Sequence, residues 1–270
     1  MNATSLRARF NRRRQRLARS ANRTILWEMV RANIKASDYH SFLGGIWSLV
    51  GTAVMLASFY YVFSRHFGQK IPGYPLYLLT GIILVNFFIT ATTHLLKALR
   101  FNRDIALNST IPRENLVLAT ISINIWKFGI ELAICTLISL AYGFFGWKSA
   151  LLLIPILLAF ISLALGVGLA LSLLFCFARD VEHVWAIFSR LFLFVTPVFY
   201  SAESLSPKMR FLISYLNPLS PYLKAFRALF MAGGALGAAD LVQCFLWGPI
   251  VLTASYLVFL RWEGEALDRT

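Results

Sequence analysis

Six long apolar stretches, separated by short polar segments, set the pattern of this chain. They run over Ile46–Ser64, Leu76–Leu96, Leu116–Ala141, Leu151–Phe177, Val184–Tyr200 and Val242–Leu260. A helix needs about 20 mostly apolar residues to cross a hydrocarbon core of about 30 Å, and each stretch is close to that length. Because backbone polar groups in lipid must be hydrogen-bonded within the chain, such stretches must be helical. The pattern therefore predicts an all-α polytopic membrane protein with six transmembrane helices.

Composition agrees with this pattern. The 270 residues are 58% hydrophobic and 14% charged, and their mean hydropathy is +0.67. The segments between the stretches are too short to bury a globular core of their own. We therefore expect a basic tail and an amphipathic helix over residues 1–45, and a six-span transmembrane domain over residues 46–270.

Positive charge is concentrated at the N-terminus, where ten of the 26 Lys and Arg residues precede Ile46. Beside a membrane span, a basic tail is expected to lie on an anionic lipid leaflet rather than to bind nucleic acid. The positive-inside rule then places both termini in the cytoplasm.

The segment Ile25–Asp38 has the pattern of an amphipathic helix. Its apolar residues share one broad arc of a helical wheel, and Arg31 and Lys35 lie on the opposite side. Asn33 is the one polar residue within the apolar arc. We expect this helix to lie flat on the inner leaflet, with Trp27 at headgroup depth.

Two further segments predict short helices outside the spans. The polar inner segment predicts a helix from about His94 to Asn108, and Pro112 stands where a new helix could start. In the outer segment 201–241, the short and largely apolar runs Lys208–Leu216 and Tyr222–Met231 lie between prolines and glycines. These runs predict two re-entrant helices, which we favour over an ordinary surface loop because a solvated loop would not need so many large apolar side chains.

Groups that could perform covalent chemistry are scarce. Glu131 is the only carboxylate within a span, the four histidines have no ligand-like spacing partners, and a G-x-x-x-x-G-K-[ST] loop is absent. The three cysteines, all in or at the ends of apolar runs, are expected to be small buried hydrophobes. We therefore expect a protein that is not an enzyme and that holds neither a metal nor a cofactor.

Three charged residues fall within the spans. Lys127 and Glu131 stand four residues apart and could form a structural pair along one helix face. Arg190 could face a watery cavity, or it could extend its side chain towards the inner surface, and both readings stay open. Gly166–Val167–Gly168 lies deep in the fourth stretch, where small residues allow close helix packing.

Aromatic side chains are dense in the first and fifth stretches. They would serve packing and interface belts, or they would offer flat faces on which sugar rings stack. The candidates for such a sugar track are Trp47, Phe59, Tyr60, Phe63, Phe188, Phe192, Phe199 and Tyr200.

Five motifs in the family's order resemble those of permease subunits of type-2 ABC transporters of the polysaccharide-export family. They are R-A-N-I-K-A-S-D-Y-H-S-F-L-G-G-I-W (Arg31–Trp47), I-P-R-E-N-L-V-L-A (Ile111–Ala119), A-R-D-V-E-H-V (Ala178–Val184), T-P-V-F-Y-S (Thr196–Ser201) and N-P-L-S-P-Y-L-K-A-F-R (Asn217–Arg227).

The resemblance implies a working unit of two permeases and two separate ATP-binding subunits, which hold ATP and Mg. It implies that the flat N-terminal helix, with Trp27, Arg31 and Lys35, is a gate at the cytoplasmic entrance. A coupling helix would dock on the ATPase, the first and fifth spans would line a channel, and the re-entrant helices would line its periplasmic exit. The expected coupling residues are Arg100, Phe101, Asn102, Arg103, Asp104 and Ile105.

The cargo that the resemblance implies is a lipid-linked polysaccharide of the O-antigen or capsule type, exported across the bacterial inner membrane during lipopolysaccharide biosynthesis. One alternative is a type-2 ABC permease for teichoic acid, a drug or a small lipid. Others are a membrane-embedded enzyme of lipid-sugar metabolism, against which the missing carboxylate cluster counts, and a non-catalytic membrane scaffold.

Overall fold

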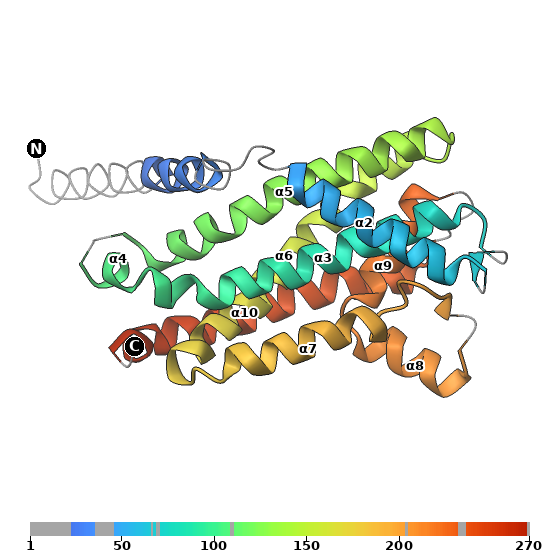
Figure 1. The fold of residues 1–270 in the computed structure, drawn as a ribbon. Coiled ribbons are helices and arrows are strands. Elements are labelled where there is room, and N and C mark those ends of the chain that lie inside the picture. Colours follow the sequence, from blue (N-terminus) through green and yellow to red (C-terminus); the bar gives the residue numbers. More distant parts are fainter. Residues whose placement is uncertain are drawn as a thin grey trace, which may run out of the picture.

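The computed structural model describes residues 23–35, 46–65, 67–68, 71–108, 111–202, 205–231 and 236–268. Regular structure in these residues is helical throughout (Figure 1). Residues 23–35 form one helix. The helices after it are α2 (Ile46–Phe63), α3 (Tyr74–Phe101), α4 (Arg103–Asn108), α5 (Arg113–Ala141), α6 (Trp147–Phe177), α7 (Val181–Val195), α8 (Pro207–Leu216), α9 (Ser220–Phe230) and α10 (Ala238–Asp268).

Four of the helices in these ranges are long and apolar enough to cross a membrane, namely α3, α5, α6 and α10. The apolar helix α2 has 18 residues, and α7 has 15. This architecture confirms the expectation of an all-α, polytopic membrane protein. The predicted basic tail lies outside the described residues, as do residues 36–45 between the N-terminal helix and α2.

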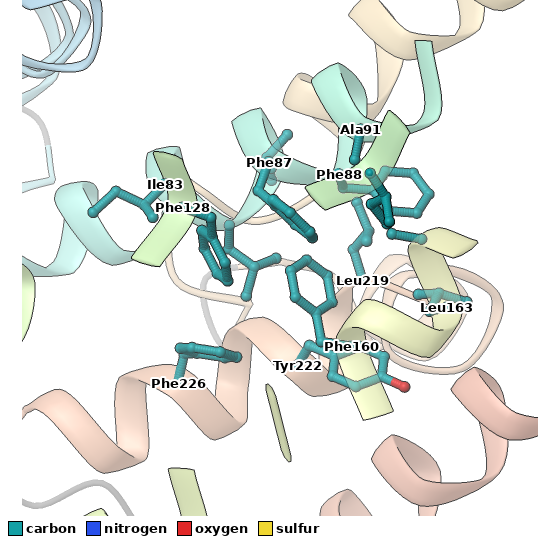
Figure 2. Packing of buried hydrophobic residues seen from close by; sticks show 14 of the residues in the cluster. Ile83, Phe87, Phe88, Ala91, Phe128, Phe160, Leu163, Leu219, Tyr222 and Phe226 are labelled. Carbon is teal, nitrogen blue, oxygen red and sulfur yellow. The ribbon is translucent and has the colours of Figure 1, made fainter. Parts of the chain in front are cut away.

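The helix α3 lies at the centre of the bundle and packs against α2, α5, α6, α7 and α9. Aromatic rings fill the space around it (Figure 2). Phe87 of α3 stacks on Phe128 of α5, with ring centroids 4.3 Å apart, and Phe160 of α6 lies 5.5 Å from the Phe87 ring. Offset and tilted rings of this kind add to the stabilisation that burial provides.

Glycines let α6 approach both of its neighbours. A Cβ on Gly166 would lie 2.6 Å from the backbone nitrogen of Leu252 in α10, and a Cβ on Gly168 would overlap the side chain of Leu95 in α3. From the other side, a Cβ on Gly248 of α10 would overlap the backbone of α6. The expected role of the Gly166–Val167–Gly168 stretch in close helix packing is confirmed.

The hydroxyl of Tyr222, on α9, is inserted into the backbone of α10. It donates to the carbonyl oxygen of Cys244 (2.6 Å) and accepts from the N–H of Gly248 (3.1 Å). An uninterrupted α-helix would join those two groups directly. Pro249 follows immediately inside α10, and a proline within a spanning helix is tolerated where neighbouring groups satisfy the backbone.

The predicted fifth span, Val184–Tyr200, is helical only as far as Val195. Thr196 is extended, with φ −78° and ψ 132°, because the ring of Pro197 disfavours the helical conformation at the preceding residue. The prediction of one continuous helical span through Tyr200 is therefore wrong.

The predicted inner helix from His94 to Asn108 is also divided. The spanning helix α3 continues through His94 to Phe101, and α4 is a separate turn of helix from Arg103. At the break, the side-chain amide of Asn102 donates to the carbonyl of Ala98 (2.8 Å), while the carbonyl of Asn102 accepts from the N–H of Ala106. Asparagine competes with regular helical bonding in this way.

Two short helices form in the outer segment, as the sequence predicts, and they differ in burial. Most side chains of α9 are buried against α3, α6 and α10, whereas α8 has no buried residue. They are linked by Asn217, whose amide donates to the hydroxyl of Thr196 (3.0 Å) and whose side-chain oxygen accepts from the N–H of Leu219 (2.9 Å).

Candidate functional site

One end of the bundle carries α4, the C-terminal end of α10 and the helix over residues 23–35, and the opposite end carries α8 (Figure 1). On α4 and the last residue of α3, two large apolar side chains are exposed: Phe101 is 76% exposed and Ile105 is 42% exposed. Asp104 lies between them in sequence and is also exposed. These three residues form what we call the α4 surface.

The other three expected coupling residues support the corner instead. The guanidinium of Arg100 lies over the ring of Phe175 on α6, 5.1 Å from its centroid. The amide of Asn102 caps α3, and Arg103 is half-buried. The six expected coupling residues therefore form two groups. Three are exposed on the α4 surface, and the other three are turned towards the bundle.

Charged side chains tie neighbouring helices together at this end. The ammonium of Lys97 on α3 contacts the carboxylate of Glu182 on α7 (2.5 Å), and Arg113 on α5 contacts Glu263 on α10 (3.3 Å). These contacts hold the frame around α4.

Two further contacts at the same end join α10 to its neighbours. The hydroxyl of Tyr256 donates to the carboxylate of Glu114 on α5 (3.1 Å), and Phe177 of α6 meets Trp262 edge-on. Neither contact joins residues close in sequence, so spacing along the chain gave no signal for them. The ends of α5, α6 and α10 nearest α4 are thereby fastened to one another.

The helix over residues 23–35 is docked on this frame. Met29 packs against Ala106 of α4 and Leu116 of α5, and the amide of Asn33 donates to the carbonyl of Ala119 (3.1 Å). The polar residue within the apolar arc is thereby explained, because it satisfies a backbone group of α5. The N-terminal helix contacts both α4 and α5.

The three expected gate residues form one exposed row of this helix. Trp27, Arg31 and Lys35 are each separated by four residues, and all three are exposed. Trp27 lies on the opposite side from the residues that contact α4 and α5, rather than within the packed arc. The row therefore presents one aromatic ring and two cations outwards.

The charged residues within the spans lie in different surroundings. The carboxylate of Glu131 is buried and accepts from the hydroxyl of Thr52 on α2 (2.8 Å). No ion pair joins Glu131 to Lys127 in the described part of the chain, so the predicted structural pair does not form there. Arg190 is exposed on α7.

The candidate sugar-track aromatics separate by burial. Phe199 is only 3% exposed and lies between Phe59 and Phe63, with ring centroids 4.5 and 4.9 Å away. Phe192 packs against Phe88 of α3, and Tyr200 is half-buried. The exposed members are Trp47, Tyr60 and Phe188.

The irregular backbone after α7 is held by side chains from other helices. Three consecutive carbonyls each accept one bond: that of Val198 from Arg227 (2.9 Å), that of Phe199 from Tyr74 (2.9 Å), and that of Tyr200 from Tyr77 (2.8 Å). Non-helical backbone at membrane depth requires such partners. In the residues described, no group of three or more possible metal ligands occurs.

The profile of the family described as ABC-2 type transporter matches residues 24–231. The chain belongs to the ABC-2 type transporter family. This match covers the N-terminal helix, the α4 corner and the short helices α8 and α9, and it confirms that the chain is a membrane transport component rather than an enzyme.

Among proteins similar to this ABC-2 chain are two O-antigen export system permease proteins RfbA. That of Klebsiella pneumoniae is 25% identical over 236 residues, which cover 87% of this chain and 90% of the relative. That of Myxococcus xanthus is 23% identical over 246 residues, covering 91% of each.

Proposed function

We propose that this ABC-2 protein is the channel-forming permease subunit of an ATP-driven exporter of a lipid-linked polysaccharide. The observation that carries the proposal is the α4 surface, where Phe101 and Ile105 are exposed on a charged corner at one end of the bundle. Exposed apolar side chains rimmed by polar ones mark protein interaction sites. The cargo is inferred from the relatives, which are named for O-antigen export.

The energy for transport would come from a partner. The sequence has no G-x-x-x-x-G-K-[ST] loop to hold nucleotide phosphates. We assign the α4 surface to docking of an ATP-binding subunit, which would hold ATP and Mg. The working unit would contain two copies of this chain and two ATP-binding subunits.

Six membrane crossings fit the observed lengths. At about 1.5 Å per residue, the 18 residues of α2 extend about 27 Å and the 15 residues of α7 about 22 Å. Thr196–Tyr200 continues beyond α7 towards the outer helices. With α3, α5, α6 and α10, these two segments would give six crossings in the bacterial inner membrane, with both termini in the cytoplasm.

The exposed row of the N-terminal helix would serve as the entrance. Arg31 and Lys35 are positioned to attract the anionic head of a lipid-linked glycan, since cations form strong, charge-assisted bonds with phosphates. Trp27 beside them suits headgroup depth. Trp47, Tyr60 and Phe188, the exposed candidate aromatics, would offer weak stacking contacts along which a polymer could move.

Reconstitution tests the proposal. The chain would be purified with the ATP-binding subunit of its own host, placed in proteoliposomes, and supplied with the host's lipid-linked polysaccharide. We expect polymer to appear in the lumen only when the chain, the ATP-binding subunit and ATP are all present. Proteoliposomes with ATP but without the two proteins, and those with the chain but without its ATP-binding subunit, should accumulate no polymer. Transport of a drug or a small lipid in place of the polymer would contradict the proposed cargo, and nucleotide hydrolysis by the isolated chain would contradict the assigned role.

A further inference from the structure

The middle of α5 carries a cation that has no counterion. Lys127 is the central residue of this 29-residue helix. It is half-buried, and it forms no ion pair in the part of the chain that the structure describes. Lysines near helix ends extend to the membrane surface, whereas charged groups at mid-span face a polar interior and mark substrate or ion pathways. The position of Lys127 therefore indicates an anionic partner from outside the chain.

The open side of α3 is polar. Leu76–Val85 is buried throughout. From there to the inner end of the span, the residues that are not buried lie on one side of the helix. Up to Lys97, they are Asn86, Ile89, Thr90, Thr93, His94 and Lys97. All but Ile89 are polar, and polar residues within spans almost always face a bundle interior or water rather than lipid.

A hydrogen bond joins this side of α3 to α5. Nδ1 of His94 lies 3.0 Å from the side-chain oxygen of Asn124. Since that oxygen can only accept, Nδ1 donates, and Nε2 is left for another partner. Lys97 follows His94 by three residues, and Lys127 follows Asn124 by three, so both cations lie on the helix faces that the bond joins. We name His94, Lys97, Asn124 and Lys127 the α3–α5 polar cluster.

Two acidic side chains adjoin the α3–α5 polar cluster, and both are engaged with other groups. The carboxylate of Glu182 on α7 contacts the ammonium of Lys97 at 2.5 Å. The carboxyl group of Glu131, one turn beyond Lys127, is bonded to the hydroxyl of Thr52 on α2 (2.8 Å). The charge of Lys127 is therefore not balanced by either of them.

We infer that the α3–α5 polar cluster binds the phosphate-bearing headgroup of the lipid-linked substrate. The inference rests on the proposed function, and it adds a cation site within the membrane to the exposed row of the N-terminal helix. Lysine binds phosphate as a point charge, through charge-assisted bonds. A lipid can bring its headgroup to this depth while its tail stays in hydrocarbon, whereas a soluble anion would have to leave water.

The headgroup would have further polar contacts beyond the cluster. Asn86 and Thr90 lie on the same side of α3, farther from the α4 end. Neither side chain is bonded to another residue in the described part of the chain. The amide and the hydroxyl can therefore donate to phosphate or sugar oxygens, and the polar side of α3 continues past the middle of the helix.

Binding can be measured with the intact transporter in nanodiscs that contain no anionic lipid, using a fluorescent polyprenyl diphosphate as the probe. All proteins would carry Arg31→Ala/Lys35→Ala, so that the entrance row does not contribute. We expect saturable binding that Lys127→Met weakens about tenfold or more, because a charge-assisted bond is lost. Lys127→Arg should retain most of the affinity. Lys148→Met, at an exposed lysine of α6, is the matched control and should bind like the parent protein.

Thermal unfolding separates this role from a structural one. An unpaired cation at mid-span costs free energy, so its replacement by an apolar side chain of similar size should raise the midpoint of unfolding in detergent. Lys148→Met should leave the midpoint unchanged. A lower midpoint in Lys127→Met would show that the lysine holds the bundle together, and it would overturn the inference.

Competition identifies the source of the phosphate. Unlabelled polyprenyl diphosphate should displace the probe, and the matching polyprenol, phosphatidylglycerol and sodium pyrophosphate should each be at least about tenfold less effective. Equal displacement by phosphatidylglycerol would assign an ordinary membrane lipid, and equal displacement by pyrophosphate would assign a soluble anion. Either result overturns the inference.

The inference and the proposed function fail in different ways. If the wild type exports polymer and Lys127→Met neither binds the probe more weakly nor exports more slowly, the α3–α5 polar cluster is refuted alone. If the wild type with its ATP-binding subunit exports no polymer, the proposed function is refuted, whatever the probe shows.

Discussion

Asn33 donates its side-chain amide to the carbonyl of Ala119, 3.1 Å away, and so fastens the N-terminal helix to α5. The same helix places Met29 against Ala106 of α4. The proposed entrance and the proposed docking corner therefore share one packed contact, through which a displacement of α4 would reach the exposed row of the N-terminal helix.

Loss of the Asn33 bond should loosen this helix. A hydrogen bond contributes about 0.5–1.5 kcal/mol, which corresponds to a roughly twofold to tenfold change in an equilibrium. We expect a cysteine introduced as Met29→Cys to react with maleimide that much faster when Asn33→Ala is added. The native cysteines, Cys135, Cys176 and Cys244, are buried and should give little background. Equal labelling rates with and without Asn33→Ala would show that the bond does not hold the helix.

Docking of the ATP-binding subunit should depend on the α4 surface. We expect Phe101→Ala/Ile105→Ala to weaken co-purification of that subunit by at least about tenfold, because buried apolar anchors dominate interfaces. Leu118→Ala, at an exposed apolar position on α5, is the control and should retain the partner. Since Arg100 packs on Phe175, its substitution would confound docking with local packing. Retention of the ATPase by the double variant would place the docking surface elsewhere.

Charge reversal tests the entrance. Arg31→Glu/Lys35→Glu should abolish polymer export in cells, since the two cations proposed to attract the anionic lipid-linked head become anions. Arg65→Glu, at an exposed arginine that follows α2 and lies outside this helix, is the control and should export polymer. Export is measured as surface polysaccharide on gels, with protein level checked by immunoblot. Unchanged polymer from the double variant would exclude a role for this row.

Removal of one hydroxyl should weaken the junction of α9 and α10. Tyr222→Phe leaves the carbonyl of Cys244 and the N–H of Gly248 without their partner, at a cost of about 1–3 kcal/mol. We expect a lower midpoint of thermal unfolding in detergent. Tyr61→Phe, at an exposed position of α2, should leave the midpoint unchanged. Equal midpoints for both variants would mean that water replaces the hydroxyl.

Glycine substitutions should separate close helix contacts from open ones. Gly166→Ala would bring a Cβ to 2.6 Å from the backbone of Leu252, so we expect severe loss of folded protein on size-exclusion chromatography. Gly129→Ala is the control, because nothing lies within 4 Å of its Cβ position. Alanine there should be neutral or stabilise α5 by about 0.5–1 kcal/mol. Comparable yields of the two variants would contradict the close contact.

Much of the helical framework could be predicted from the sequence, because the length of an apolar run reflects the helix length that is needed to cross a bilayer. The errors arose where a local signal competed with that pattern. Pro197 ended α7 within an apolar run, and Asn102 broke the inner helix with its side chain. Both residues were visible in the sequence, but the prediction gave the hydropathy pattern more weight than their local effects on the backbone.

Partners from other helices could not be predicted from spacing. Lys127 and Glu131 have the separation of a helical pair, yet Glu131 bonds to Thr52 of α2. Phe199 matched the composition of a sugar track but is enclosed by its own chain. The cleft lined by α8, α9 and α10 likewise depends on these helices meeting in space. Such contacts follow from the tertiary arrangement, which periodicity along one helix does not contain.

The near-contact of α6 and α10 at Gly166 and Gly248 has a mechanical consequence. The backbones of these two helices are in contact, and the hydroxyl of Tyr222 also bonds α10 to α9. Neither helix can therefore slide or rotate independently of the other without a steric clash. They would keep their relative positions during the transport cycle. The helices that move to open and close a pore would then be those with fewer contacts to the rest of the bundle, namely α2, α7 and the N-terminal helix.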